Sequence, residues 1–307
     1  MACALNCMTL DPSLNPGLAS KTLASSKPER ELHMLSVNTN MGAMIALQAL
    51  NKTNHDMAMT QNRINTGLNV ASAKDDGATY AIAQNMRGEV ASLRAVDTSI
   101  GRAISAVDTA LAAGEAISDL LIDMKEKALA ASDVSLDTAS RDALNEDFVA
   151  LREQIATIYA NATFNGVNLV DGSVTDITPL ASADGSSVIT VGAEDLSLGG
   201  TVLTVAATQQ IATQTDAASA LTDVDASLQN VNEALARLGT AAKKLEVHQN
   251  FIGKLSDTLR GGIGNLVDAD LAVESARLQS LQVKQQLGVQ ALSIANSAPQ
   301  IVLSLFR

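Results

Sequence analysis

The sequence predicts a mainly α-helical protein: a long, coiled-coil-like rod of antiparallel helices that carries a small β-rich insertion. Three observations predict this fold class. Apolar residues recur at alternating steps of three and four from Met34 to about Asn168 and from about Leu221 to Leu292, the pattern with which long helices pack side by side. Between these stretches, short β-prone segments alternate with glycine turns. Aromatic residues make up 2% of the chain, which suits narrow helix seams better than a thick core.

The first predicted helix follows an atypical start. Residues 1–33 hold three of the five prolines and show no helical period, so we expect a disordered extension or a start assigned upstream of Met34. A helix is predicted over about 38–66, and Gly67 supplies its stop. A polar connecting loop is expected over 67–77. The apolar face of this helix is predicted to contain Ala43, Leu47, Leu50, Met57 and Ile64.

Two more helices are predicted before the insertion, over about 78–131 and 138–160. The first of them would be on the order of 80 Å long at about 1.5 Å per residue. Its seam is expected to contain Ile82, Met86, Leu93, Val96, Ile100, Ala103, Val107, Ala110, Ile117, Leu121, Met124 and Ala128. The second should direct Leu144, Phe148, Leu151, Ile155 and Ile158 inward.

The residue pattern changes over about 165–210, where Asn-Gly, Asp-Gly and Gly-Gly pairs separate short segments rich in valine. We expect a small β-rich insertion at the tip of a helical hairpin. A return helix is predicted over about 216–258, a break at Gly261-Gly262-Ile263-Gly264, and a last helix over about 267–296. The return helix retraces the outgoing one, so both termini are expected at one end of the rod.

Composition narrows the function. The net charge of −12 disfavours nucleic acid and anionic lipid surfaces, and no apolar run is long enough for a membrane span. Cysteine occurs only at positions 3 and 7, so we expect neither a disulfide framework nor a thiolate metal site. The three histidines lack metal-ligand spacing, and no nucleophile–base pair can be assembled. We therefore expect a protein that is not an enzyme and has no cofactor.

The terminal helices are the main indication of function. Both are amphipathic, yet each has little to pack against except the other, and isolated helices of this length are marginal in water. We expect them to become ordered when copies of the chain associate. Head-to-tail contacts related by a rotation that does not close generate an open helical fibre.

Motifs at both ends resemble bacterial flagellin, the subunit of the flagellar filament. The N-terminal block contains Asn38-Thr39-Asn40, then 61–67 (QNRINTG) and 72–78 (SAKDDGA). The C-terminal block contains 268–272 (DADLA), 274–276 (ESA), 286–287 (QL), 291–296 (ALSIAN) and 299–305 (PQIVLSL). In that family the same two blocks surround a variable middle, and here they cover roughly 34–170 and 216–307.

The resemblance implies a structural subunit that self-assembles into a helical tube for swimming motility and is secreted into the extracellular flagellum. The implied partners are other copies of the chain, the flagellar type III export apparatus, a C-terminal export chaperone, and the hook-associated junction and cap proteins. A hook–filament junction protein is the nearest alternative, and a coiled-coil binding or signalling module is a more distant one.

The resemblance also implies a division of the chain into six segments. They are an atypical extension (1–33), the N-terminal helix and spoke loop of the inner filament core (34–77), the N-terminal part of the rod (78–164), a β-rich surface insertion (165–212), the returning helix (213–260) and the C-terminal helix of the inner core (261–307).

Site residues follow from the same resemblance. N-terminal assembly residues would be Asn38, Thr39, Asn40, Leu47, Leu50, Arg63, Asn65, Gly67, Lys74, Asp75 and Asp76. C-terminal assembly residues would be Asp268, Asp270, Leu271, Leu278, Leu292, Asn296, Pro299, Gln300, Leu303 and Leu305. Family members detected by the animal innate receptor for flagellin carry Arg, Leu and Gln where this chain has Asp123, Lys127 and Ala130, so we expect weak or absent receptor activation.

Overall fold

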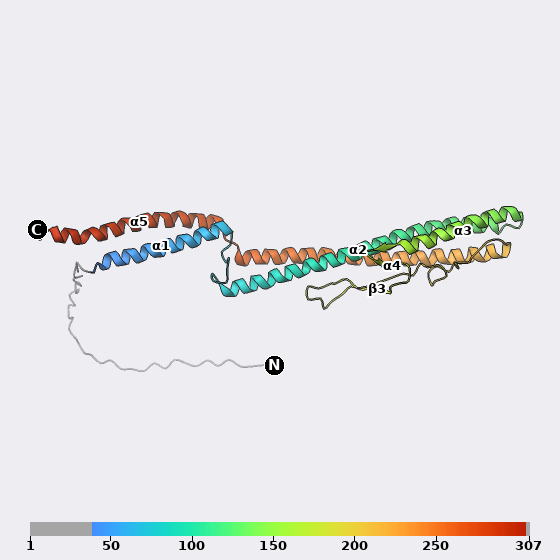
Figure 1. Ribbon diagram of the computed structural model, residues 1–307, viewed down its shortest axis with the longest axis horizontal. Coiled ribbons are helices and arrows are strands. Elements are labelled where there is room, and N and C mark those ends of the chain that lie inside the picture. The colour runs from blue at the N-terminus through green and yellow to red at the C-terminus, as the bar shows by residue number, and fades with distance from the viewer. Residues whose placement is uncertain (1–38, 305–307) are drawn as a thin grey trace, which may run out of the picture. The chain divides into compact units, whose positions relative to one another are not determined.

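The computed structural model describes residues 39–304, with side chains described for residues 39–297. The predicted extension (1–33), Asn38 and Leu305 lie outside the described residues, as do the side chains of Pro299, Gln300 and Leu303. The chain forms two compact units (Figure 1). A smaller unit combines the residues up to Asp56 with those from Leu281 onward, and a larger unit comprises Met57–Ser280. Helices α1 (Met41–Thr66) and α5 (Leu271–Ser304) contribute residues to both units.

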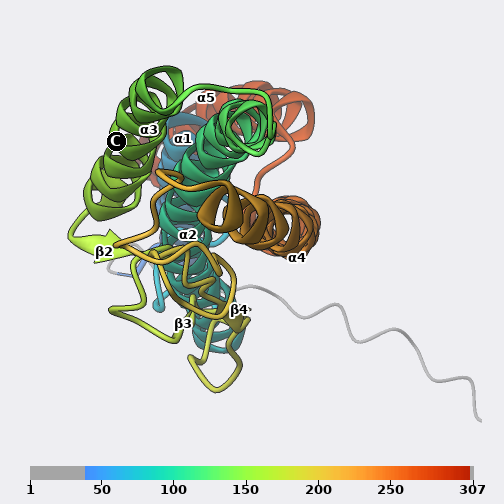
Figure 2. The ribbon, with the colours of Figure 1, turned by 90° about the vertical axis from the view of Figure 1, so that its right-hand side faces the viewer.

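The larger unit is built on two long antiparallel helices, α2 (Gly77–Ala131) and α4 (Gln214–Val267), with α3 (Thr138–Asn161) packed against α2 (Figure 2). Their antiparallel register is visible at close contacts. A Cβ on Gly114 would lie 2.7 Å from Leu235 Cδ2, so glycine lets α4 approach α2 there. Lys125 Nζ lies 2.6 Å from Asp225 Oδ1 further along the pair. The helices predicted over about 78–131 and 138–160 are therefore confirmed, and the return helix begins within two residues of its predicted start.

The heptad seam is the hydrophobic core of this unit. From Leu93 to Ala128 every predicted seam residue of α2 is buried, and α4 contributes Val224, Val231, Leu238, Leu245 and Ile252. Phe148 and Ile155 of α3 complete the core as predicted. The exceptions are Met86, which is half-buried, and Ile82, whose side chain is 53% exposed because Ala83 takes the buried position beside it.

The predicted helix break at Gly261-Gly262-Ile263-Gly264 is wrong. Helix α4 continues through all three glycines and ends at Val267, where the Asp268 N–H donates to the Gly264 carbonyl at 2.8 Å. None of these glycines has the positive φ of a helix stop. Packing maintains the helix here: a Cβ on Gly262 would lie 3.0 Å from Met86 Cε, so the missing side chain makes room for α2. Helix α5 also runs further than predicted, from Leu271 to Ser304.

The segment between α3 and α4 contains four two-residue strands in two antiparallel pairs. They are β1 (Thr163–Phe164) with β2 (Val167–Asn168), and β3 (Asp176–Ile177) with β4 (Val191–Gly192). Asn165 and Gly166 form the turn between β1 and β2 with φ of 50° and 79°, as an Asn-Gly hairpin requires. The β-rich insertion is thus confirmed, although most of it is loop.

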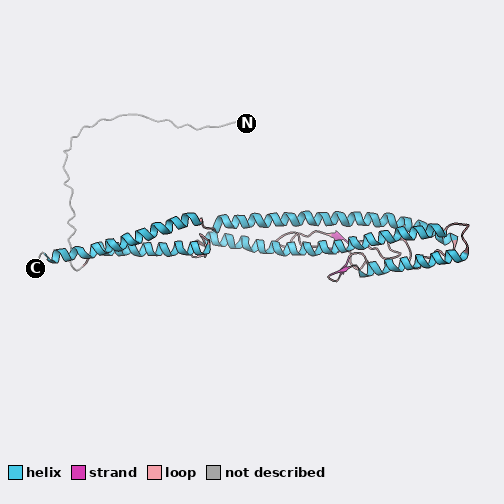
Figure 3. Ribbon diagram, turned by 90° about the horizontal axis from the view of Figure 1, so that it is seen from above, coloured by secondary structure: helices cyan, strands magenta, loops and turns pink. Residues whose placement is uncertain are grey.

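The insertion does not sit at the tip of the hairpin, as the sequence suggested, but lies along the sides of α2 and α4 (Figure 3). The Leu180 N–H donates to Ser99 Oγ of α2 at 3.3 Å, and His248 Nε2 of α4 lies 2.8 Å from the Ala181 carbonyl oxygen. Its apolar side chains join the main core. The buried ones are Leu169, Val170, Ile189, Val191, Leu196, Val202, Leu203, Val205 and Ile211. Burial of these side chains explains why the segment folds back onto the helices.

Candidate assembly surface

The smaller unit pairs the start of α1 with the end of α5 in antiparallel orientation. The Asn40 side chain begins α1 by accepting the Ala43 N–H at 3.0 Å, and its Nδ2 donates to the Ala295 carbonyl at 2.7 Å. Gln285 Nε2 donates to Asn54 Oδ1 at 2.8 Å. Asn40, predicted as an assembly residue, therefore joins the two terminal segments within one chain.

The contact surface of this pair is small and partly polar. Its positions recur at steps of three and four, as in a coiled coil. On α1 they are Ala43, Ala46, Leu50 and Thr53; on α5 they are Leu281, Gln285, Gly288, Leu292 and Ala295. Among the described side chains of this unit only Leu281 is fully buried. Beside its three leucines the seam consists of alanine, glycine, threonine and glutamine, which bury little apolar area, so few large apolar contacts hold the two segments together.

Large apolar side chains of the same segments point outward. On α1 they are Met41, Met44, Ile45 and Leu47; on α5 they are Val283, Leu287, Val289 and Ile294, all between 47% and 70% exposed. We call these eight residues the apolar surface. Leu47, predicted on one apolar face with Ala43 and Leu50, is 47% exposed, because Ala46 occupies the seam and the next residue lies about 100° around the helix. Apolar patches of this extent mark sites of association.

A short loop and the start of α5 are joined within the larger unit. Gly67 has φ of 71° and ends α1. Its carbonyl accepts the Ala269 N–H at 2.9 Å, and the Asn69 N–H donates to the Val267 carbonyl at 2.7 Å. Val70, Ala83 and Val267 form a small core beneath these bonds. The predicted loop over 67–77 is therefore tied to the α4–α5 junction.

The acidic residues predicted as assembly residues in this region organise the local backbone. Hydrogen bonds from the Ser72 hydroxyl and N–H lower the pKa of Asp75. Asp76 caps α2, and hydrogen bonds from the Thr79 hydroxyl and N–H lower its pKa. Asp268 follows the end of α4, and Asp270 begins α5 by accepting the Ala272 N–H at 2.9 Å. The carboxylates of Asp76 and Asp270 therefore cap helices, and that of Asp75 orders the loop before α2.

Arg63 contacts a residue that sequence reasoning did not select. Its Nη1 lies 3.1 Å from Oε1 of Glu274, whose side chain is 9% exposed. Oε2 of Glu274 has no hydrogen-bond partner among the described residues. The sequence contained an indication of this contact. Glu274 lies four residues before Leu278, in the three–four pattern of α5 seam positions, and it is the only charged residue among those described positions. Arg63 therefore neutralises a carboxylate that the α1–α5 seam buries.

The remaining predicted residues lie at different places. Leu278 and Leu292 are half-buried in the seam, whereas Thr39, Asn65, Lys74, Leu271 and Asn296 are exposed. On α2, Asp123 and Ala130 are exposed. Lys127 Nζ lies 3.0 Å from Asp147 Oδ2 of α3, and this hydrogen bond raises the pKa of Lys127. The three receptor-related positions thus lie on α2, far along the chain from the apolar surface.

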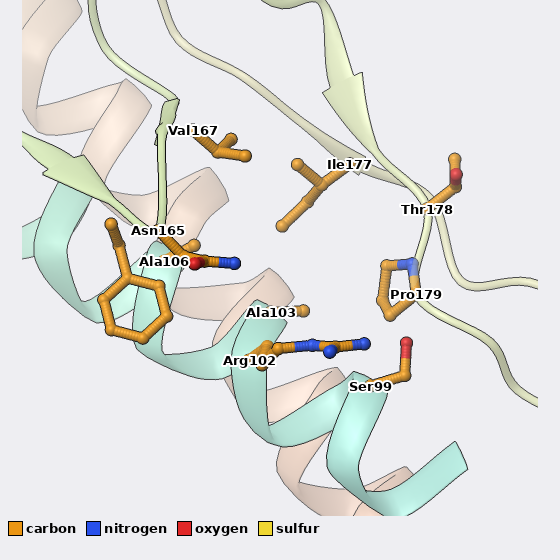
Figure 4. Close-up of a pocket in the computed structure, with 10 residues that line it drawn as sticks. Ser99, Arg102, Ala103, Ala106, Asn165, Val167, Ile177, Thr178 and Pro179 are labelled. Atoms are coloured by element: carbon orange, nitrogen blue, oxygen red, sulfur yellow. The ribbon is translucent and has the colours of Figure 1, made fainter. Parts of the chain in front are cut away.

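One cleft of about 230 Å³ lies between α2 and the insertion (Figure 4). Arg102 and Ser99 of α2 face Asn165 and Pro179 across it. The lining contains the hydroxyl groups of Ser99 and Thr178 but no His, Cys, Asp, Glu or Lys side chain that could act as a general base. Within residues 39–304, no group of three or more His, Cys, Asp or Glu side chains is placed to hold a metal ion, and no described helix is long and apolar enough to cross a membrane.

A long helical bundle together with a weakly paired, apolar helical unit defines a class: structural proteins that associate with copies of themselves. Residues 37–175 match the bacterial flagellin N-terminal helical region and residues 221–306 match the bacterial flagellin C-terminal helical region. The chain is 55% identical to flagellin FljK of Caulobacter vibrioides over 272 residues, covering 89% of this chain and 98% of that one. It is 37% identical to a flagellin of Brucella melitensis, covering 89% of this chain and 100% of the relative.

The chain therefore belongs to the bacterial flagellin family and is a structural subunit of the flagellar filament. The filament is an extracellular homopolymer. A putative flagellar hook-associated protein from Vibrio parahaemolyticus shares the fold, with a TM-score of 0.53 at 12% identity, covering 63% of this chain and all of that one. The likeness to that protein is one of fold alone.

Proposed function

We propose that the apolar surface of α1 and α5 is the principal contact between neighbouring subunits. The observation that carries this proposal is the distribution of side chains in the helix pair. The seam holds three leucines among small and polar side chains, while the eight large apolar side chains of the apolar surface are exposed. Such an arrangement is unfavourable for a solitary helix pair. It becomes favourable when other copies cover the outward side.

The energetics require many of these contacts to form together. Full burial of one large aliphatic side chain contributes about 1.5–3 kcal/mol, whereas loss of translational and rotational freedom on association costs about 4–15 kcal/mol. One or two contacts cannot offset that cost, but eight repeated on every subunit can. Assembly on this surface is therefore cooperative. By the same reasoning residues 34–77 and 261–307 form the inner core of the tube, with Asn38, Pro299, Gln300, Leu303 and Leu305 belonging to it.

Before assembly the same side chains need to be kept from premature association. We propose that a cytoplasmic chaperone covers α5 and that the unfolded chain leaves the cell through the flagellar type III export apparatus. Hook-associated junction and cap proteins then contact the two ends of the filament. Two features support this route: the apolar residues of α5 are exposed, and the chain has only the two cysteines near its start, so no disulfide framework opposes unfolding.

The substitution Leu287→Glu tests the apolar surface. Leu287 is 62% exposed, so the change should leave helix content unaltered. It places a charge in the contact, and we expect the critical concentration for polymerisation to rise at least tenfold, measured by sedimentation. Gln286→Glu adds the same charge at the neighbouring exposed position and should have less than a threefold effect. Equal behaviour of the two variants would remove the apolar surface from the proposal.

Receptor activation tests the three substituted positions on α2. Asp123 reverses the sign of the matching Arg, Lys127 is held by Asp147 in place of an apolar contact, and Ala130 shortens the side chain. Purified monomer is expected to give weak or no signal in a reporter cell assay for the animal flagellin receptor. The triple substitution Asp123→Arg, Lys127→Leu and Ala130→Gln should increase that signal. Potent activation by the unaltered monomer would refute this expectation.

A further inference from the structure

Two groups of exposed charged side chains lie on different helices of the larger unit. Four acidic residues of α2 form a line on one face, which we call the acidic stripe: Asp108, Glu115, Asp119 and Glu126. Three lysines of α4 are grouped elsewhere, and we call them the lysine patch: Lys243, Lys244 and Lys254. All seven side chains are exposed. None of them forms a salt bridge within 4.0 Å in the part of the chain that the structure describes.

Three cationic side chains of the larger unit already form ion pairs within the chain. These ion pairs are Lys125–Asp225 at 2.6 Å, Lys127–Asp147 at 3.0 Å and Arg237–Glu194 at 2.7 Å. The stripe therefore keeps its negative charge, and no described side chain of its own subunit neutralises it. The lysine patch keeps an excess of positive charge, because Glu246 is the one acidic residue between Lys243 and Lys254. Both surfaces are available for charges from another molecule.

The two surfaces face outward from different helices. With about 100° per residue, the stripe positions lie within roughly 40° of one another and opposite the buried Ile117 and Met124. Lys243 and Lys254 lie in the same way opposite the buried Leu245 and Ile252 of α4. One subunit therefore cannot bring its own stripe onto its own patch. Complementary surfaces on different sides of one molecule make a heterologous contact, the type that generates open fibres.

Apolar side chains accompany the charges on each side. Val247 and Phe251, 63% and 55% exposed, lie beside the lysine patch. Ile122 and Leu129, 52% and 57% exposed, flank the acidic stripe. An apolar centre with complementary charges around it is the usual composition of a specific protein contact. A second copy of this chain thus supplies the opposite charges and the apolar side chains that each surface requires in a partner.

We propose that the acidic stripe of one subunit packs against the lysine patch of a neighbouring copy, and that this contact sets the axial shift between laterally adjacent subunits in the filament. Gln249, in the lysine patch region, lies beside Gly101 of α2. Glu115 and Asp119 are 14 and 18 residues beyond Gly101, which corresponds to roughly 21–27 Å along the helix. Parallel subunits without a shift would leave the stripe and the patch at different levels along the helices. A shift of that size brings opposite charges together.

Charge reversal tests this contact, which rests on the self-assembly of the chain. Lys243→Glu with Lys254→Glu reverses the patch, and Glu115→Lys with Asp119→Lys reverses the stripe. Each double variant is expected to raise the critical concentration for filament formation at least tenfold at 0.15 M salt, measured by sedimentation. The chain carrying all four changes restores opposite charges and should return to within threefold of the unaltered protein. Circular dichroism should show the same helix content throughout.

A matched control separates the stripe from net charge. Asp142→Lys with Glu146→Lys changes the charge by the same amount on exposed positions of α3 and should alter the critical concentration less than threefold. Three results would each overturn the contact. They are charge reversals that leave the critical concentration unchanged, a four-site variant that does not return to the critical concentration of the unaltered protein, and a control that raises it as much as the stripe reversal does. If the unaltered chain forms no filaments, self-assembly itself is overturned. The sample of unaltered protein therefore separates a failure of self-assembly from a failure of the proposed contact.

Discussion

Removal of residues 267–307 is expected to abolish filament formation while leaving a folded helical bundle. The deletion takes away α5, and with it half of the apolar surface and the partner of α1. The main core is unaffected, because its buried residues lie between Leu93 and Ile252. The truncated chain should sediment as a monomer and show no filaments by electron microscopy. Its thermal unfolding, followed by circular dichroism, should remain cooperative.

The intact chain under the same precipitating conditions is the control for this truncation. Normal filaments from the truncated chain would mean that the long helices alone carry assembly, and the role proposed for α1 and α5 would be lost. Loss of the cooperative unfolding transition would instead mean that the bundle depends on α5. Val267, Val70 and Ala83 form only a small separate core, so we expect the bundle to remain stable without it.

The second large effect is expected from Leu203→Ala in the insertion. Leu203 is fully buried in the main core, and truncation of such a residue to alanine costs about 2–5 kcal/mol of unfolding free energy, depending on how far the site can collapse. The measurement is denaturant unfolding of the monomer. The insertion would then behave as part of the bundle, although sequence suggested only a surface segment.

Val188→Ala supplies the comparison, since Val188 lies in the same insertion but is 49% exposed. Its unfolding free energy should change by less than about 0.5 kcal/mol. If both variants were equally mild, the insertion would be a detachable surface segment. If both were severe, the exposed loop of the insertion would be contributing more than its burial indicates.

The helices could be predicted closely because one physical rule, the three–four spacing of apolar residues, determines them. Phe148 and Ile155 of α3 were assigned to the core on spacing alone, and both are fully buried. The rule weakens where apolar residues are too many for one seam. On α1 both Ala46 and Leu47 satisfy the spacing, and only the contact with α5 decides that alanine faces inward.

Other features depended on contacts between segments distant in sequence. Glycines usually mark a helix end, but Gly262 accommodates Met86 of α2 and the helix continues. The position of the insertion depended on Ser99 and His248, which receive its loop. The burial of Glu274 depended on Arg63, 211 residues away. The assembly residues were predicted from motifs, and their geometry could be described only from the fold.

The continuous path of α4 through Gly261, Gly262 and Gly264 has a mechanical consequence. Each glycine in a helix costs about 1 kcal/mol relative to alanine, because it gains backbone freedom when the chain unwinds. Three within four residues make this turn the softest part of a 54-residue helix. Curvature imposed on the subunit is therefore expected to concentrate here, outside the main core, whose last buried residue along the chain is Ile252.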